Sequence, residues 1–219
     1  MPALAIAHRA ANFVDGLAVA HALGADVVEC DVHEHRGRLE VRHLKMAGPL
    51  PFLWDKWEAR ARIRPAPGAR RAARRQPARR DMMLDLKGRR VSTALAVMDL
   101  VSRSGYRHPL MVCSRHWPLV DVFAGLPSVG RVLSARNRIE LARLRRRLAE
   151  TEPVYGVSVH RSLLDRRVVA ELSRFVEVVM TWPVNDLAAL DDVLDLGVTG
   201  VISDEDAVVA ELVRRRGRS

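Results

Sequence analysis

Short apolar runs alternate along the chain with segments whose apolar residues recur at helical spacing. The runs are rich in β-branched residues and do not alternate cleanly between polar and apolar positions. That pattern is typical of parallel strands covered on both faces. Eight such runs are predicted as strands, over residues 4–8, 26–33, 82–87, 110–114, 129–133, 154–160, 176–182 and 198–203.

Nearly every predicted strand is followed by a predicted helix. The helices are expected over residues 13–23, 92–102, a short stretch from Pro118, 137–149, 165–174, 186–196 and 206–215. Eight βα units in a chain of 219 residues fit a small α/β protein of the (β/α)₈ TIM-barrel type. A doubly wound open sheet is the alternative, but eight strands would make it large for this length. Residues 1–219 are therefore predicted to form one domain.

The interval between the second and third predicted strands is much longer than the others. It contains an apolar run at 39–43, reached through Gly37, which predicts a β-hairpin. It also contains nine arginines and no acidic residue between positions 59 and 80. Prolines 65, 67 and 77 make this stretch a poor core element. We therefore expect residues 59–80 to form a basic surface excursion between the second and third barrel strands.

The net charge of the chain is +10, from 36 Lys and Arg against 26 Asp and Glu. Such a balance suggests anionic partners: nucleic acid, a membrane surface or phosphorylated small molecules. Nine of these charges belong to residues 59–80, which leaves about +1 for the rest. This stretch has no aromatic residues, which argues against nucleic acid. A small phosphodiester is the expected partner; peripheral membrane contact is not required but stays open, and the oligomeric state is not indicated.

The two cysteines, Cys30 and Cys113, are too few for a disulfide framework. No apolar run approaches the ~18 residues that span a bilayer, and the N-terminus lacks the basic region of a signal peptide. These features predict a cytoplasmic protein. Cys30 lies between Glu29 and Asp31 in sequence, so it is expected to point away from the barrel centre, toward the helices.

Chemistry in a barrel of this kind lies where the strands end. Polar and charged residues stand at those ends in this chain: His8 and Arg9, Glu29 and Asp31, His43 after the hairpin, Asp85 and Lys87, His160, Trp182 with Asn185 just beyond, and Asp204. Glu29, Asp31 and Asp85 place three carboxylates on adjacent strands. Crowded carboxylates repel one another unless a cation neutralises them, and hard oxygen ligands suit Mg²⁺ or Ca²⁺. Pairing with arginines is the alternative.

His8 and His43 flank this carboxylate cluster and titrate near neutral pH, so they are a candidate acid and base pair. Arg9 and Lys87 add the positive charge that a bound phosphate requires. A divalent metal, two histidines and two cations at one barrel mouth are the components of phosphodiester cleavage. His160 and Trp182 at strand ends, with Asn185, are candidates for lining the substrate pocket, although Trp182 could equally be a core residue.

Six segments, taken in chain order, are similar to motifs of a known family: IAHR, GADVVECDVH, VRH, MLDLKG, TWPVND and GVTGVISDED. Together they resemble the pattern of the glycerophosphodiester phosphodiesterase family, within the superfamily of PLC-like phosphodiesterase barrels. The resemblance covers nearly the whole chain except about residues 44–80. It implies a (β/α)₈ barrel that hydrolyses glycerophosphodiesters to an alcohol and glycerol 3-phosphate.

The resemblance also implies roles. The residues matching His8 and His43 are the family's acid/base pair, and those matching Glu29 and Asp31 hold its divalent metal. The third ligand is usually glutamate. Here Asp85 stands in its place with Lys87 two residues on, which is more similar to the spider-venom sphingomyelinase D branch. That branch cleaves choline-type phospholipids by an intramolecular attack.

The chain departs from the family pattern at several positions. Ala10 replaces a glycine, the usual Glu-Asn-Thr is absent with Asn12 as its nearest remnant, and Leu44 replaces the aspartate beside the second histidine. Metal-dependent glycerophosphodiester hydrolysis is the leading hypothesis. The alternatives are a lysophospholipase D or sphingomyelinase D-like activity on lysophospholipids, and a catalytically inactive barrel that binds a phosphate-bearing ligand.

Overall fold

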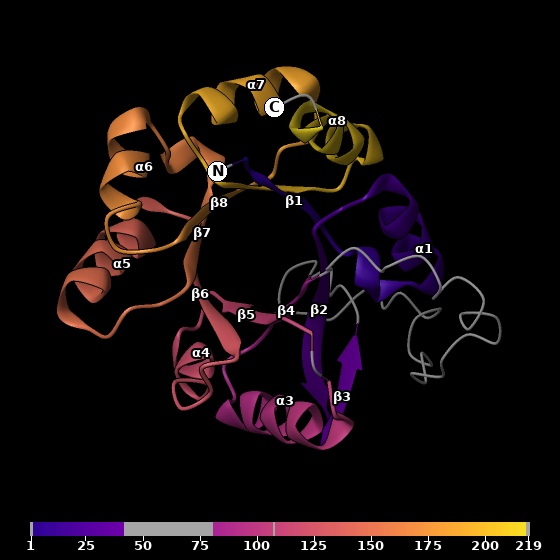
Figure 1. Ribbon diagram of the computed structural model, residues 1–219. Helices are drawn as coiled ribbons and strands as arrows, with labels where there is room; N and C mark the ends of the chain where they lie inside the picture. The colour runs from indigo at the N-terminus through magenta and orange to yellow at the C-terminus, as the bar shows by residue number, and fades with distance from the viewer. Residues whose placement is uncertain (1, 42–80, 107, 218–219) are drawn as a thin grey trace, which may run out of the picture.

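Eight parallel strands close into a barrel in the computed structural model, which describes residues 2–41, 81–106 and 108–217 (Figure 1). The sheet order is β1-β9-β8-β7-β6-β5-β4-β2-β3, and an additional parallel pairing of β1 with β2 closes the ring. The strands are β1 (Leu4–Ala7), β2 (Val27–His35), β3 (Arg38–Val41), β4 (Asp81–Leu86), β5 (Leu110–Ser114), β6 (Val129–Ala135), β7 (Gly156–His160), β8 (Val178–Trp182) and β9 (Gly200–Ser203).

Helices surround this barrel as an outer ring (Figure 1). They are the 3₁₀ helices η1 (Ala10–Asn12) and η2 (Arg161–Leu163), and the α-helices α1 (Val14–Leu23), α3 (Val91–Ser104), α4 (Pro118–Asp121), α5 (Arg138–Glu150), α6 (Arg166–Leu172), α7 (Leu187–Asp195) and α8 (Asp206–Arg216). The predicted (β/α)₈ barrel is confirmed.

The predicted hairpin is present as β3, which pairs antiparallel with the end of β2 outside the barrel ring. Arg36 and Gly37 both have positive φ, at 51° and 73°. Two such residues in succession are the requirement of a two-residue type I′ turn, and glycine adopts this conformation without a steric penalty. His43, Leu44 and the arginine-rich residues 59–80 lie outside the described residues.

Strand alternation divides the apolar side chains into two clusters. The outer cluster packs the strands against the helices and includes Cys30, whose outward direction was expected from its neighbours. The inner cluster fills the barrel and is formed by Ile6, Val27, Met83, Met111, Cys113, Val132, Val178, Met180 and Ile202. Gly156 and Gly200 make room for it: a Cβ on Gly156 would lie 2.9 Å from the Val178 carbonyl oxygen, and one on Gly200 2.8 Å from Met180 Cγ.

The helices on the second half of the barrel begin at side-chain caps. Asn137, Asp165 and Asp186 accept hydrogen bonds from the backbone N–H three residues on, at 2.9, 2.7 and 2.7 Å. These caps satisfy donors that the first helical turn leaves unpaired. They explain why the predicted starts of α5, α6 and α7 agree with the structure within one residue.

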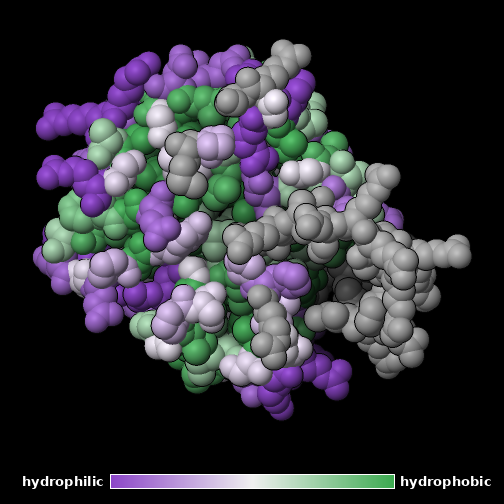
Figure 2. Space-filling view, in the orientation of Figure 1, coloured by the Kyte–Doolittle hydropathy of each residue, from purple (hydrophilic) through white to green (hydrophobic). Residues whose placement is uncertain are grey.

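The outer surface carries both charged and apolar side chains. Figure 2 shows hydrophilic side chains projecting around the rim of the molecule with hydrophobic ones between them. Ion pairs join neighbouring helices and their flanks, as between Arg145 and Glu171 (2.8 Å) and between Arg147 and Asp121 (2.7 Å). Among the residues that the structure describes, no helix combines the length and the apolar character needed to cross a membrane.

Candidate active site

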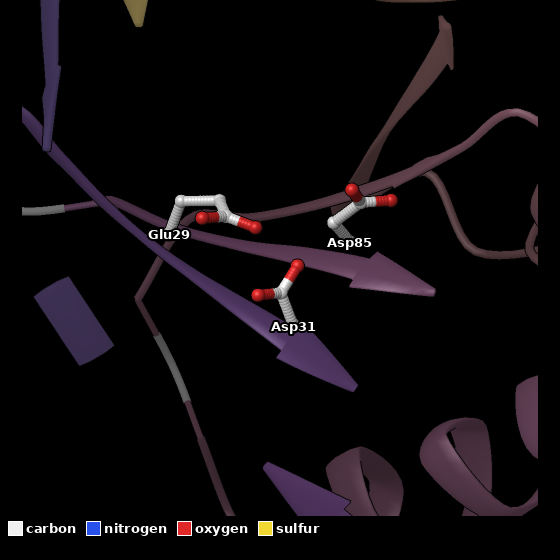
Figure 3. Close-up of side chains that lie close together, drawn as sticks. All are labelled: Glu29, Asp31 and Asp85. Atoms are coloured by element: carbon white, nitrogen blue, oxygen red, sulfur yellow. The ribbon is translucent and has the colours of Figure 1, made fainter. Parts of the chain in front are cut away.

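Three carboxylates converge inside the carboxyl end of the barrel. Glu29 and Asp31 lie on the inward face of β2, and Asp85 stands opposite Asp31 in the register of β2 with β4. One oxygen from each lies within 4.8 Å of the others, and Figure 3 shows the three side chains pointing toward one another. Glu29 is 2% and Asp31 0% exposed. The structure therefore brings together the three residues that were predicted from the sequence as metal ligands.

Burial of this cluster has an electrostatic consequence. Desolvation raises the pKa of Glu29 to about 7; the charges of Asp31 and Asp85 raise it as well, while His8 and Lys87 oppose the shift. Glu29 Oε1 is buried, with no hydrogen-bond partner among the described residues. A buried carboxylate oxygen without a partner is costly unless a cation neutralises it. The donor set, made of carboxylate oxygens alone, fits Mg²⁺ or Ca²⁺.

Lys87 supplies part of the neutralising charge. Its Nζ lies 2.6 Å from Asp31 Oδ1 and also contacts the Asp85 carboxylate. Burial alone would lower the pKa of Lys87, but the charges of Asp85, Asp31 and Glu29 together raise it above its usual range. Lys87 therefore stays an ammonium ion. Two of the three carboxylates have a lysine as their cationic partner, where the alternative from the sequence was pairing with arginines.

Asn12, which the sequence analysis left without a role, holds Asp31 in place. Its Nδ2 donates to Asp31 Oδ2 at 3.1 Å, and its Oδ1 accepts from the Asp31 backbone N–H at 2.9 Å. Asn12 is 4% exposed. Asn12 is the last residue of η1, just before α1 in the chain, and η1 places the amide over β2. A buried amide that bonds both the side chain and the main chain of a carboxylate fixes that carboxylate's rotamer.

His8 lies beside the carboxylates at the end of β1. Its Nδ1 is 2.9 Å from Asp204 Oδ1, and its Nε2 is 3.7 Å from Glu29 Oε2. Burial lowers the pKa of His8, but the hydrogen bond to Asp204 and the charges of Glu29 and Asp204 outweigh it and raise the pKa above its usual value. Asp204 is thus the orienting partner of His8, a function that its strand-end position alone did not reveal.

Arg9 forms hydrogen bonds with both Glu29 and Asp204 beside His8. Its backbone is left-handed, with φ 55°, and its N–H donates to Glu29 Oε2 at 2.7 Å. Its guanidinium contacts Asp204, with Nε 3.0 Å from Oδ1. Burial raises the pKa of Asp204, but bonds and charges from His8 and Arg9 hold it well below its usual range. In the structure the Arg9 charge is paired with Asp204, and the contact of Arg9 with a phosphate stays a prediction.

The opposite side of the mouth carries the predicted substrate contacts. His160 and Trp182 are neighbours in the register of β7 with β8, and their rings meet edge to face with centroids 5.1 Å apart. Both are partly exposed, and Trp182 also packs against the inner apolar cluster. Asn185 Oδ1 accepts from the Asp204 backbone N–H at 3.3 Å. Asn185 therefore steadies the loop that presents Asp204. His43 lies outside the described residues, which leaves His8 as the member of the predicted histidine pair that can be placed.

Comparison with known proteins gives one clear result, which concerns the fold. No family model matches the sequence, and a search of curated proteins finds no match. Solved structures do match. The chain is similar to a putative glycerophosphoryl diester phosphodiesterase from Silicibacter pomeroyi, with 19% identity and a TM-score of 0.75, covering 99% of this chain and 95% of that one.

Two further structures match as fully. One is an Oleispira antarctica phosphodiesterase in complex with the product sn-glycerol-3-phosphate, with 18% identity, a TM-score of 0.69, and coverage of 98% of this chain and 97% of that one. The other is a glycerophosphodiester phosphodiesterase from Thermotoga maritima, with 18% identity, a TM-score of 0.66, and coverage of 97% and 98%. At these identities the likeness establishes the fold, and it agrees with the barrel that the sequence resemblance implies.

Proposed function

We propose that this chain is a metal-dependent phosphodiesterase of the glycerophosphodiester type, which releases an alcohol and glycerol 3-phosphate. The observation that carries the proposal is the corner where His8, oriented by Asp204, meets Lys87 and three carboxylates, two of them fully buried. The six sequence segments that resemble the family support it. So do structural neighbours that are named as enzymes of this activity.

Glu29, Asp31 and Asp85 would hold the divalent metal, Mg²⁺ or Ca²⁺. When bound, the ion supplies positive charge that stabilises the charge developing on the phosphoryl oxygens. Asn12 and the Arg9 N–H each hold one ligand by a hydrogen bond, so the ligand oxygens are positioned before any ion arrives. Lys87, already at the same carboxylates, adds a second positive charge for the phosphate oxygens.

His8 moves a proton in this scheme. A carboxylate can only accept, so Asp204 fixes the Nδ1–H tautomer, and Nε2 faces the site as the atom that exchanges a proton. In hydrolysis the attacking hydroxyl loses a proton as its oxygen bonds to phosphorus, the phosphorus–oxygen bond to the alcohol breaks, and the alcohol oxygen gains a proton. His8 serves one of these transfers. His43 is proposed for the other on the family resemblance alone, and His160, Trp182 and Asn185 are proposed to contact the substrate.

The test is an assay of the purified protein on glycerophosphocholine and glycerophosphoethanolamine. We expect turnover with Mg²⁺ or Ca²⁺, its loss with chelator, and its return when the metal is added back. His8→Ala is expected to lower kcat/KM by about 10²–10⁴-fold. His108→Asn, an exposed histidine away from the mouth, is the matched control and should leave kcat/KM unchanged. Turnover that is unchanged by chelator, or that is retained in the His8→Ala variant, would contradict the proposal.

A second candidate, cleavage of lysophospholipids, is favoured by one specific feature. A groove of about 400 Å³ runs between α1 and α8, and its lining includes Arg9, Asp204 and Phe13. The adjoining face of α1 is apolar yet exposed: Phe13 is 49%, Val14 69% and Leu17 37% exposed. Such a surface beside the mouth suits an acyl chain. Release of choline from lysophosphatidylcholine would support this candidate, and its absence with intact glycerophosphodiester turnover would exclude it.

A further inference from the structure

Four neighbouring barrel strands are each followed directly by a cationic residue. Lys and Arg occupy 36 of 219 positions, roughly one in six, so a cation after four strands in a row is more than composition supplies. The strands are β4, β5, β6 and β7, adjacent in the sheet, so the four side chains form an arc along one half of the mouth. We call them the cationic arc: Lys87, Arg115, Arg136 and Arg161.

The arc is connected to the proposed metal ligands by a pocket. This pocket has a volume of about 350 Å³, and its lining includes Asp85, Lys87, Arg89 and Arg115. Arg115 is held at its edge, because its Nη2 donates to Glu140 Oε1 at 2.5 Å. The Glu140 carboxylate also accepts from the backbone N–H of residue 136 at 2.6 Å. Both acids of the lining are therefore paired, Asp85 with Lys87 and Glu140 with Arg115. Arg89 is exposed and forms no ion pair with a described residue.

The far end of the arc reaches the aromatic pair. Arg136 and Arg161 are exposed, and neither guanidinium forms an ion pair with a residue in the described ranges 2–41, 81–106 and 108–217. Burial lowers the pKa of His160, and the charges of Arg136 and Arg161 lower it further. Arg136 directly follows β6 and Arg161 directly follows His160 at the end of β7, so both arginines lie beside the place where His160 meets Trp182. At the other end of the arc, Lys87 and Arg115 are paired with acids.

We infer that the arm of the substrate lying over β5–β7 carries its own phosphate group, so that the preferred substrate is a phosphodiester with a second anionic centre. This inference rests on the proposed function for the diester that is cleaved, and it specifies the class of the other moiety. Guanidinium groups bind phosphate oxygens through paired hydrogen bonds. A cationic arm such as choline or ethanolamine would be repelled by the same side chains.

The test compares three substrates: glycerophosphocholine, glycerophosphoglycerol and bis(glycerophospho)glycerol, whose second arms are cationic, neutral and anionic. We expect kcat/KM to rise in that order, by about tenfold from first to last at low salt, with the ratio falling as NaCl is added. The double variant Arg136→Gln/Arg161→Gln is expected to lower kcat/KM about tenfold for the anionic substrate, and by less than about twofold for glycerophosphocholine. Arg146→Gln, an exposed arginine on α5, is the control and should change neither.

Equal kcat/KM values on the three substrates, or a parallel fall on all of them in the double variant, would overturn the inference while leaving the phosphodiesterase intact. If none of the three substrates is hydrolysed, the proposed function fails. The role of the cationic arc is then tested separately by ligand binding. Calorimetry would then compare glycerol 1,3-bisphosphate with glycerol 3-phosphate. Tighter binding of the bisphosphate by about tenfold, lost in the double variant, would support the arc, and equal affinities would overturn it.

Discussion

The two ends of the barrel interior are built on opposite principles. At the amino end Val27, Met83, Val178 and their neighbours fill the barrel around glycines that leave no spare volume. At the carboxyl end the next inward positions of β2 and β4 carry Glu29, Asp31 and Asp85, and burial removes the solvation of the first two. One end gains stability from packing, while the other concentrates negative charge that Lys87 neutralises only in part. Along the single strand β2, successive inward positions change from a core residue, Val27, to a candidate metal ligand, Glu29, within two residues.

The largest expected effect comes from neutralising the charged end. Glu29→Gln removes one proposed metal ligand, so we expect kcat/KM to fall by about a hundredfold or more. In chelator the same change should raise the free energy of unfolding by about 1 kcal/mol, because a buried carboxylate is replaced by a neutral isostere. Urea denaturation and the diesterase assay measure the two effects. A variant that loses both activity and stability would contradict the contrast between the ends.

The next effect concerns the support of the ligands. Asn12→Ala removes both hydrogen bonds to Asp31, so we expect metal affinity to fall by about 10–100-fold. Calorimetric titration with Mg²⁺ or Ca²⁺ measures it. Asn137→Ala is the matched control: it removes the cap of α5 and should cost about 1 kcal/mol of stability with no change in metal affinity. Equal losses of metal affinity in the two variants would show that Asn12 has no special role at the site.

Packing at the amino end gives a purely structural effect. Gly156→Ala would place a methyl group 2.9 Å from the Val178 carbonyl oxygen, so we expect it to destabilise the fold by about 1–3 kcal/mol. Gly125→Ala meets no atom within 4 Å and serves as the control. Thermal and urea denaturation compare them, and the folded Gly156→Ala protein should retain its metal affinity. A loss of metal affinity at unchanged stability would reverse the roles assigned to the two ends.

The smallest effect is a dependence on pH. The pKa of Asp204 is held below its usual range in the folded state, so this group contributes stability above the unfolded value of about 3.9 and loses it as the pH falls. Wild type should therefore exceed Asp204→Asn in free energy of unfolding by about 1 kcal/mol near neutral pH. The difference should shrink as the pH falls below about 3.9 and vanish only below the depressed pKa of the folded state. Denaturation at several pH values tests this. A difference that stays constant over the range would mean that the ionised carboxylate makes no net contribution.

Much of this molecule follows from local pattern. Short apolar runs indicate where the strands lie, side-chain caps mark the starts of α5, α6 and α7, and strand alternation places Glu29 and Asp31 on one face. The position of Asp85 near the end of its strand likewise follows from the barrel rule that chemistry lies at strand ends. The resemblance to a family then supplied a role for each residue, which alternation cannot do.

Other features exist only because the barrel closes. Asp204 meets His8 across 196 residues of sequence, since β9 and β1 are neighbours in the ring. Asn12 meets Asp31 because η1 folds over β2. Periodicity reports which face a side chain occupies, but the partner it meets there depends on register and ring closure. Local sequence pattern thus specifies the elements and the face that carries the carboxylates, whereas closure of the ring specifies which groups orient, neutralise and hold those carboxylates.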